Sequence, residues 1–560
     1  MYQVIKPINI DKNLPGPEPH ILFGILPYIL GHREQWFTET NHRAKLYNRT
    51  WGGTLPRFPK FPPAMFYLSH EANIKHVLQD NFGNYVKGDR LNAAFKDLLG
   101  DGIFAVDGLK WKVHRQLMSR MFSRNLLRYS ASNMRQKLLD ALDDMKDELK
   151  KKFSMGVKAG TVKSEGSYIQ IDMKDLLMRL TFDATTQLAF GLDLDTVSCI
   201  HEGNSQKKKE HPFFTAFDEM NILVYLRLHD PLFPIKRMFG IGREKRVKEL
   251  VRKIDEFAMN IIKERRMKLR CAGNRTQEQG VSPLASDGLS ASPSNSGSRS
   301  KPANNFDLLT KYIEYGQKEN ESVPEQYLRD IILNVMLAGE YRRWLLPNIE
   351  TTSTNFHILN VCPTAEIGRD TTANTLTWAF YELERNPTTK QKLIHEVKQV
   401  CGTGDKAQYT YETMSKLQYT HFVALETLRM HPPVPENLRH AVKKDTLPDG
   451  TNIPAGAAIG ISSCAMGRSE RLWGEDASDF RPERFLEKKE PTPFEFPTFH
   501  AGPRICIGRP LALIQIKLVL SIILNSDLEF QDRVGYSGDY QMGLTMSMKD
   551  TFPMNVSWKK

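Results

Sequence analysis

The sequence lacks any apolar run long enough to cross a membrane, and it is poor in cysteine. An apolar stretch near the start, residues 21–30, is interrupted by Gly24 and Pro27, whereas a membrane-spanning helix needs about 20 mainly apolar residues. The six cysteines form no C-x-x-C pair, which argues against a zinc ribbon and against c-type haem attachment. So few cysteines among 560 residues also argue against a disulfide framework and favour a reducing compartment.

Other absences narrow the class of protein further. The net charge is +12 and the pI is about 9.2, yet no compact basic motif with interleaved aromatic residues is present. This combination argues against nucleic-acid binding and favours an acidic partner or an anionic membrane surface. No internal repeat with a period of about 20–50 residues is visible, and the composition is that of an ordinary globular enzyme.

The order of residue patterns predicts short mixed strands to about residue 75 and mostly helices from there to about residue 270. Residues 272–304 are rich in Ser, Gly, Asn and Pro, which predicts a disordered linker because little there can be buried. A helix is expected to restart at residues 322–325, which read Ser-Val-Pro-Glu and resemble a capping box with proline in the first turn.

The strongest signal for chemistry lies at residues 499–508, which read Phe-His-Ala-Gly-Pro-Arg-Ile-Cys-Ile-Gly. A thiolate that binds iron needs backbone N–H groups directed at its sulfur, and therefore a tight turn. We expect Gly502 and Gly508 to permit that turn, and Arg504 to supply a cation for a haem propionate. The alternative is a buried, inert cysteine. The full pattern F-x-x-G-x-R-x-C-x-G resembles the cysteine loop of the cytochrome P450 haem-thiolate monooxygenases, with Cys506 as the iron ligand.

This resemblance implies the fold, the domain organisation and the cofactor. The fold would be mainly α with small β-sheets: the cytochrome P450 fold, a triangular helical prism with haem b between the distal I helix and the proximal cysteine loop. Residues 14–560 would form a single domain. Residues 1–13 are polar and do not look like the N-terminal anchor that relatives carry, so we expect this anchor to be absent or missing from a truncated gene model.

Further motifs follow in the order that the family shows. Glu426 and Arg429 match the E-x-x-R of the K helix, and residues 482–485 match the P-E-R-F segment. Residues three apart share one face of a helix, and we expect Arg484 to complete a buried trio with a structural role.

Two more motifs supply the propionate partners that the resemblance implies. Trp111 and Arg115 match the W-x-x-x-R of the C helix, where residues one turn apart can reach the same propionate. His440, in a His-Ala-Val segment, stands where relatives place a further propionate partner.

The helix that relatives use to activate oxygen is interrupted in this sequence. The family pattern A-G-x-D-T supplies a carboxylate and an alcohol that relay protons, and Asp370 and Thr371 match its last two positions as the catalytic pair. Residues 337–339 match its beginning, but residues 340–368 intervene. Removing that stretch restores Leu-Ala-Gly-Arg-Asp-Thr-Thr-Ala. We interpret residues 340–368 as a retained intron; the alternative is a genuine surface insertion.

Several segments resemble the fatty-acid omega-hydroxylase branch of plants and fungi, among them residues 100–108, 466–468 and 473–474. That resemblance implies a long-chain fatty acid or alkane as substrate. Two alternatives remain: an isomerase or dehydratase of lipid hydroperoxides, and a haem-binding protein whose catalysis the insertion impairs.

The resemblance also implies partners and a location. Electrons would come from NADPH through a separate NADPH–cytochrome P450 reductase, because no flavin or nicotinamide fingerprint is present. Arg509 and Lys517 are candidates to dock the acidic face of that reductase. The expected location is the cytoplasmic face of the endoplasmic reticulum membrane, with the apolar residues 231–235 as a candidate contact with the bilayer.

Overall fold

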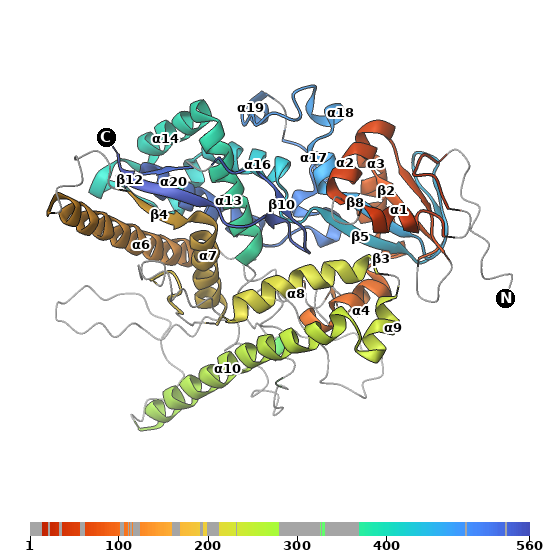
Figure 1. The fold of residues 1–560 in the computed structure, drawn as a ribbon, viewed down its shortest axis with the longest axis horizontal. Helices are drawn as coiled ribbons and strands as arrows, with labels where there is room; N and C mark the ends of the chain where they lie inside the picture. Colours follow the sequence, from red (N-terminus) through yellow and green to blue (C-terminus); the bar gives the residue numbers. More distant parts are fainter. Residues whose placement is uncertain are drawn as a thin grey trace.

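In the computed structural model the chain folds as a mainly helical molecule with small β-sheets, as predicted (Figure 1). The described residues are 14–20, 23–32, 36–56, 62–100, 106–109, 111–112, 115, 124–158, 168–190, 194–198, 212–230, 232–278, 325, 328–330, 369–487, 490–532 and 535–559.

The main helical body surrounds a helix that is apolar on nearly every side. This helix, α20 (Arg509–Asn525), buries almost every residue from Leu511 onward, as expected for a helix at the centre of a core. It packs against five other helices of the described chain. These are α6 (Arg124–Lys158), α13 (Arg369–Arg385), α14 (Pro387–Cys401), α15 (Tyr411–Lys416) and α16 (Tyr419–Met430).

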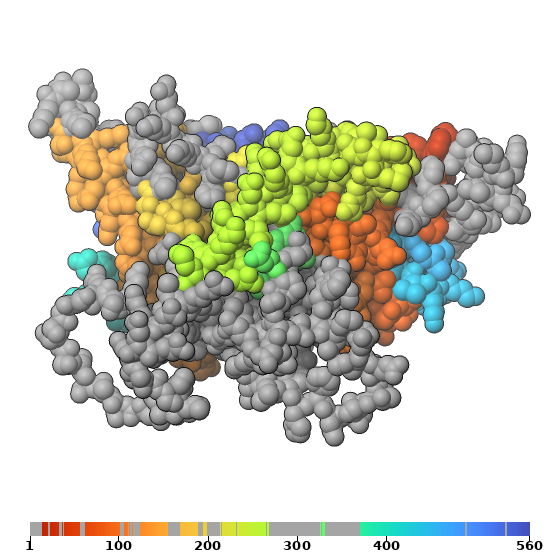
Figure 2. Space-filling view, turned by 90° about the horizontal axis from the view of Figure 1, so that it is seen from below, coloured from red at the N-terminus to blue at the C-terminus, as the bar shows by residue number. Residues whose placement is uncertain are grey.

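A second group of helices crosses one face of the molecule. In Figure 2, residues 212–278, coloured yellow-green, run across this face beside the orange segment that contains α4 (Gly88–Leu99). The yellow-green segment comprises α8 (Pro212–Leu228), α9 (Phe233–Phe239) and α10 (Arg243–Glu278), and α8 packs against both α4 and α10. The cavity described below lies under α4 and α8.

The main sheet joins the start of the chain to a segment about four hundred residues later. Its strand order is β1-β2-β8-β5-β3, with β2 and β8 parallel and the other pairs antiparallel. All residues of β2 and β8 are buried, as expected for central strands covered on both faces. The strands are β1 (Trp51–Thr54), β2 (Ala64–Leu68), β3 (Tyr85–Val86), β5 (Glu436–Ala441) and β8 (Ala458–Ser462).

The structure corrects two predicted boundaries. Helix α10 continues to Glu278, so the first seven residues of the predicted 272–304 linker are helical, and the remainder lies outside the described residues. The segment before residue 75 contains α1 (Leu26–Gly31) and α2 (Trp36–Tyr47) as well as strands. Glu325 and residues 328–330 are helical, consistent with the predicted restart. The proposed insertion, residues 340–368, lies outside the described residues.

No helix in the described part of the chain combines the length and the apolar character needed to cross a bilayer.

The predicted trio of Glu426, Arg429 and Arg484 forms a fully buried ion cluster. The Nε atoms of Arg429 and Arg484 donate to the two carboxylate oxygens of Glu426 over 2.8 and 2.9 Å. Arg429 also donates to the backbone oxygens of Ala477 and Gly467. The cluster therefore fixes α16 to the chain that precedes the cysteine loop, which is a structural role.

Replacing Glu426 by glutamine should destabilise the fold by about 3–5 kcal/mol, because two buried guanidinium groups then lose their shared counter-charge. Chemical denaturation followed by circular dichroism measures this change. The matched control is Glu256→Gln, which breaks an exposed pair with Arg252 and should leave the midpoint unchanged. Equal midpoints for the two variants would contradict a structural role for the trio.

Candidate functional site

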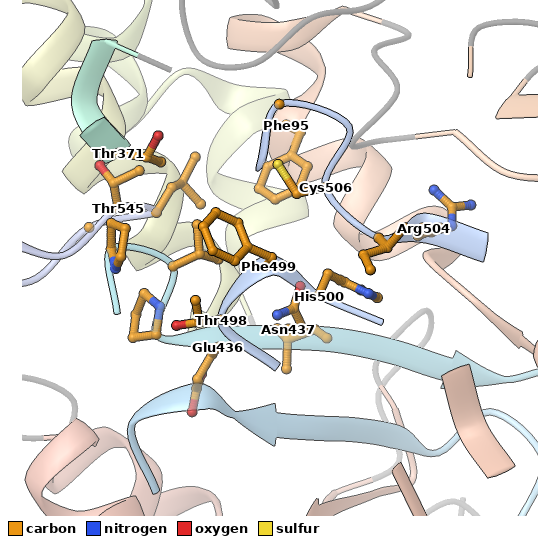
Figure 3. Close-up of a pocket in the computed structure, with 18 of the residues that line it drawn as sticks. Phe95, Thr371, Glu436, Asn437, Thr498, Phe499, His500, Arg504, Cys506 and Thr545 are labelled. Atoms are coloured by element: carbon orange, nitrogen blue, oxygen red, sulfur yellow. The ribbon is translucent and has the colours of Figure 1, made fainter. Parts of the chain in front are cut away.

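A cavity of about 300 Å³ lies between β5, helices α4, α8 and α13, and the loop that precedes α20. Figure 3 shows side chains from these separate segments directed into one space. The lining is mainly apolar and includes Leu91, Phe95, Leu228, Val434, Leu438, Phe499 and Ile516. A mostly apolar cavity with a few polar groups is typical of a binding site for a small molecule.

Cys506 borders this cavity from the loop between Arg504 and the start of α20. Its backbone N–H donates to the carbonyl oxygen of Phe499 over 2.7 Å, which closes the loop. Gly502 has φ +64°, and a Cβ there would lie 2.1 Å from the backbone oxygen of Leu78, so only glycine fits. The side chain of Cys506 is exposed, as a ligand for a group bound in the cavity must be.

The corresponding expectation for Gly508 was wrong. Gly508 has φ −74° and ψ −4°, which any residue adopts. Gly508 stands directly before the first residue of α20, and this position at the start of a helix explains its backbone angles.

Trp111 and Arg504, predicted from separate motifs, lie against each other beside the cavity. The Arg504 guanidinium lies 4.6 Å from the centre of the Trp111 ring, and it donates to a carboxylate oxygen of Asp107 over 2.7 Å. Arg115 also borders the cavity. The structure thus brings together three of the predicted partners of the propionates.

Three further basic residues border the same region, and the motifs did not identify them. They are Lys87, Arg439 and His500. Arg439 is fully buried, with one guanidinium nitrogen 2.5 Å from Nε2 of His500. Its Nε has no hydrogen-bond partner among the described residues.

Burial and mutual repulsion lower the pKa values of these three basic groups. Burial and the nearby Arg504 lower the pKa of Arg439 to about 9. Burial together with Arg439 holds the pKa of Lys87 well below its usual value, and the same two causes lower the pKa of His500. Asp107 is the carboxylate that opposes the charges of Lys87 and Arg439.

A ligand that carries carboxylates would compensate this excess of positive charge. Buried charges of one sign cost free energy unless they are paired, and Asp107 is the carboxylate that opposes both buried cations, Lys87 and Arg439, while it also pairs with Arg504. Haem b brings two propionates on a flat apolar ring, and it needs one soft axial ligand of the kind that the Cys506 sulfur provides. The residues present therefore fit the haem that the sequence predicts.

His440 occupies a different place from the other predicted propionate partners. It is not among the residues that border the cavity, and its Nδ1 lies 2.9 Å from the backbone oxygen of Lys87. Its neighbour Arg439 does border the cavity. The first four residues of β5, ending at Arg439, border the cavity, and His440 lies just beyond them along the strand.

The predicted proton-relay pair is divided between two environments. Thr371, in the first turn of α13, borders the cavity together with Thr375. Asp370 is only 3% exposed, does not border the cavity, and has a carboxylate oxygen 3.5 Å from the amide nitrogen of Asn221 on α8. An aspartate in the first turn of a helix is favourable because it opposes the helix dipole.

Comparisons with known proteins agree with this geometry. The family model described as "Cytochrome P450" matches residues 14–534. "Cytochrome P450 704B1" from Arabidopsis thaliana is 30% identical over 521 residues, covering 88% of this chain and 86% of that protein. "Cytochrome P450 94A2" from Vicia sativa is 28% identical over 561 residues, covering 97% and 91%. "Cytochrome P450 86B1" from Arabidopsis thaliana is 28% identical over 501 residues, covering 86% and 75%.

Proposed function

The chain belongs to the cytochrome P450 family, whose members are haem-dependent monooxygenases, and on that premise we propose that it hydroxylates a long-chain lipid, a fatty acid or an alkane. Electrons would pass from NADPH through a separate reductase. The observation that supports the proposal is the cavity itself: its lining is mainly apolar, and it extends to the Cys506 thiol.

We assign the residues of the chain as follows. When bound, haem supplies the iron at which O2 is activated. Cys506 would hold that iron through its sulfur, and Arg504, Trp111, Arg115 and Arg439 would hold the propionates. Arg439 takes this role in place of His440 because it borders the cavity and has an unpartnered, buried Nε.

The remaining side chains position the substrate and its proton. The Thr371 hydroxyl borders the cavity and is placed to pass a proton into it, while Asp370 acts through its neighbours on α8 and α13. Phe95 and Leu438 hold an alkyl chain and exclude water, which would otherwise compete for protons.

The docking surface for the reductase needs one correction. Lys517 is buried, and its ammonium group donates to the backbone oxygen of Met414, so it cannot meet a partner. Arg509 is partly exposed beside the cysteine loop and pairs with Glu490. We propose Arg509 alone as a contact with the acidic face of the reductase.

A membrane location is proposed from the apolar surface of α9. Met238 and Phe239 are 72% and 67% exposed, and Leu232, Ile235 and Ile241 are exposed beside them. Lys236 and Arg237 lie on the same short helix. Apolar side chains interleaved with cations suit the interface of an anionic bilayer, such as the cytoplasmic face of the endoplasmic reticulum.

Reconstitution with reductase tests the proposed activity. Haem-loaded protein, with and without residues 340–368, is mixed with NADPH, a plant P450 reductase and a long-chain alkane or fatty acid. We expect a hydroxylated product that requires both NADPH and reductase. Product formed only from a lipid hydroperoxide, without reductase, would instead establish the isomerase or dehydratase alternative.

A further inference from the structure

One part of the cavity wall is polar, in contrast to its apolar lining elsewhere. Tyr225, on α8, and His229, which directly follows that helix, contribute to this part together with Glu436 from β5. In Figure 3 the carboxyl group of Glu436 points away from Cys506. The polar group is therefore separate from the sulfur that would hold the haem iron.

The carboxylate of Glu436 is held in place by hydrogen bonds from two aromatic side chains. The indole Nε1 of Trp36 donates to a carboxylate oxygen of Glu436 over 3.1 Å and to the hydroxyl of Tyr67 over 2.8 Å. Tyr67 also hydrogen-bonds to Glu436. Among the described residues, no lysine or arginine forms an ion pair with Glu436. Burial raises the pKa of Glu436 to about 7, so a further negative charge nearby would be unfavourable.

Tyr225 has a buried hydroxyl without a hydrogen-bond partner among the described residues. Its side chain borders the cavity and the residue is only 5% exposed. Its ring lies against that of His229, with centroids 4.6 Å apart and the ring planes tilted by 47°. A buried polar atom without a partner costs free energy and calls for an explanation. A polar atom of the bound substrate would be the missing partner.

Tyr225 and Glu436 lie close enough for the charge of one to affect the other. The negative charge of Glu436 contributes to the raised pKa of the Tyr225 hydroxyl, together with burial, so that this hydroxyl remains a neutral donor and acceptor. The pair therefore offers one neutral hydroxyl and one carboxyl group to the cavity. An alcohol can donate to the carboxyl group and accept from the hydroxyl, whereas an ionised carboxylate can only accept.

We propose that Tyr225 and Glu436 form a head-group site that selects an uncharged, hydroxyl-bearing lipid, such as a long-chain alcohol, over a free fatty-acid anion. This inference rests on the proposed monooxygenase function and names a different preferred lipid for it, an uncharged, hydroxyl-bearing chain in place of a free fatty acid. The cations of the cavity do not weaken it, because Arg115, Arg439 and Arg504 would hold the haem propionates and Lys87 lies beside Arg439 and Arg504.

Ligand binding to the haem-loaded protein tests this selection directly. An alkane, a primary alcohol and a carboxylate of equal chain length are titrated at neutral pH, and the spectral shift of the haem gives each dissociation constant. We expect the alcohol to bind about tenfold more tightly than the carboxylate, as an added hydrogen bond without charge repulsion implies.

Two variants test whether Tyr225 and Glu436 bind the head group of the ligand or only pack against its alkyl chain. Tyr225→Phe should weaken binding of the alcohol about three- to tenfold and leave the alkane unchanged. Glu436→Gln keeps the shape but removes the negative charge, so the carboxylate should bind about tenfold more tightly. The matched control is Tyr409→Phe, which alters a buried tyrosine that bonds to Asn525 outside the cavity, and it should change none of the three affinities.

The outcomes distinguish this inference from the proposed function. Tighter binding of the carboxylate than of the alcohol by the unaltered protein would overturn the inference. So would a Tyr225→Phe variant that weakens alkane and alcohol equally. If all three chains bind without preference, the inference fails while the proposed function stands. If none binds, both fail. Should Tyr225→Phe not fold, Glu436→Gln and the unaltered protein still decide.

Discussion

Replacing Cys506 by alanine should remove thiolate ligation of haem and reduce hydroxylation by about a thousandfold or more, a loss of at least about 4 kcal/mol of transition-state stabilisation. Neither Cys401 nor Cys464 can substitute for it. Cys401 and Cys464 are buried, and burial raises their pKa values to about 11 and about 12, so both remain protonated thiols. The carbon-monoxide spectrum of the reduced protein reports the ligand directly.

The matched control is Cys464→Ala, which removes a buried thiol that does not border the cavity. This variant should keep both the thiolate spectrum and the activity. A Cys506→Ala protein that still shows thiolate coordination would overturn the assignment of the haem site, and with it every role given to the residues around it.

The sequence predicted those parts of the site whose residues lie within a few positions of one another in the chain. The cysteine loop places Gly502, Arg504 and Cys506 within five residues, so the turn that joins them is a local property. The pair of Glu426 and Arg429 was predictable for the same reason, because both residues lie on one face of α16, whereas Arg484, 58 positions away, was added through the resemblance to the family. The backbone of Gly508, in contrast, depends on where α20 begins, which the motif alone does not define.

Contacts between distant segments could not be predicted in this way. Arg439 borders the cavity and His440 does not because of where β5 passes out of the cavity wall, which depends on how this strand pairs within the sheet. The bond from Trp36 to Glu436 joins residues 400 positions apart, and neither residue belongs to a motif. A buried hydroxyl such as that of Tyr225 becomes recognisable as a site only when its surroundings are known.

The end of α10 shows a different limit. Residues 272–278 read Ala-Gly-Asn-Arg-Thr-Gln-Glu, and their polar composition resembles that of the linker that follows. A helix already formed extends at little cost, because each added residue gains one hydrogen bond. Composition therefore placed the beginning of the predicted linker about two turns too early, and its remaining residues lie outside those that the structure describes.

Deleting residues 340–368 should raise hydroxylation at least about tenfold relative to the full chain. The deletion joins Gly339 to Arg369 and restores the unbroken family sequence around Asp370 and Thr371. Turnover of both forms with reductase, on equal amounts of haem-loaded protein, measures the change. Deleting residues 280–300, from the Ser- and Gly-rich segment, is the control of similar size and should leave turnover unchanged.

The physical reason lies at the start of α13. Helix α13 begins at Arg369, so Thr371 lies in its first turn. Backbone N–H groups in the first turn lack partners within the helix, and helix ends fray. A hydroxyl that passes protons must be held within a fraction of an ångström of its acceptor, which a helix continuous on both sides achieves and a helix end does not. Equal turnover of the two forms, or retention of the segment in all spliced transcripts, would show that residues 340–368 are a genuine insertion and that Thr371 is positioned without a continuous helix.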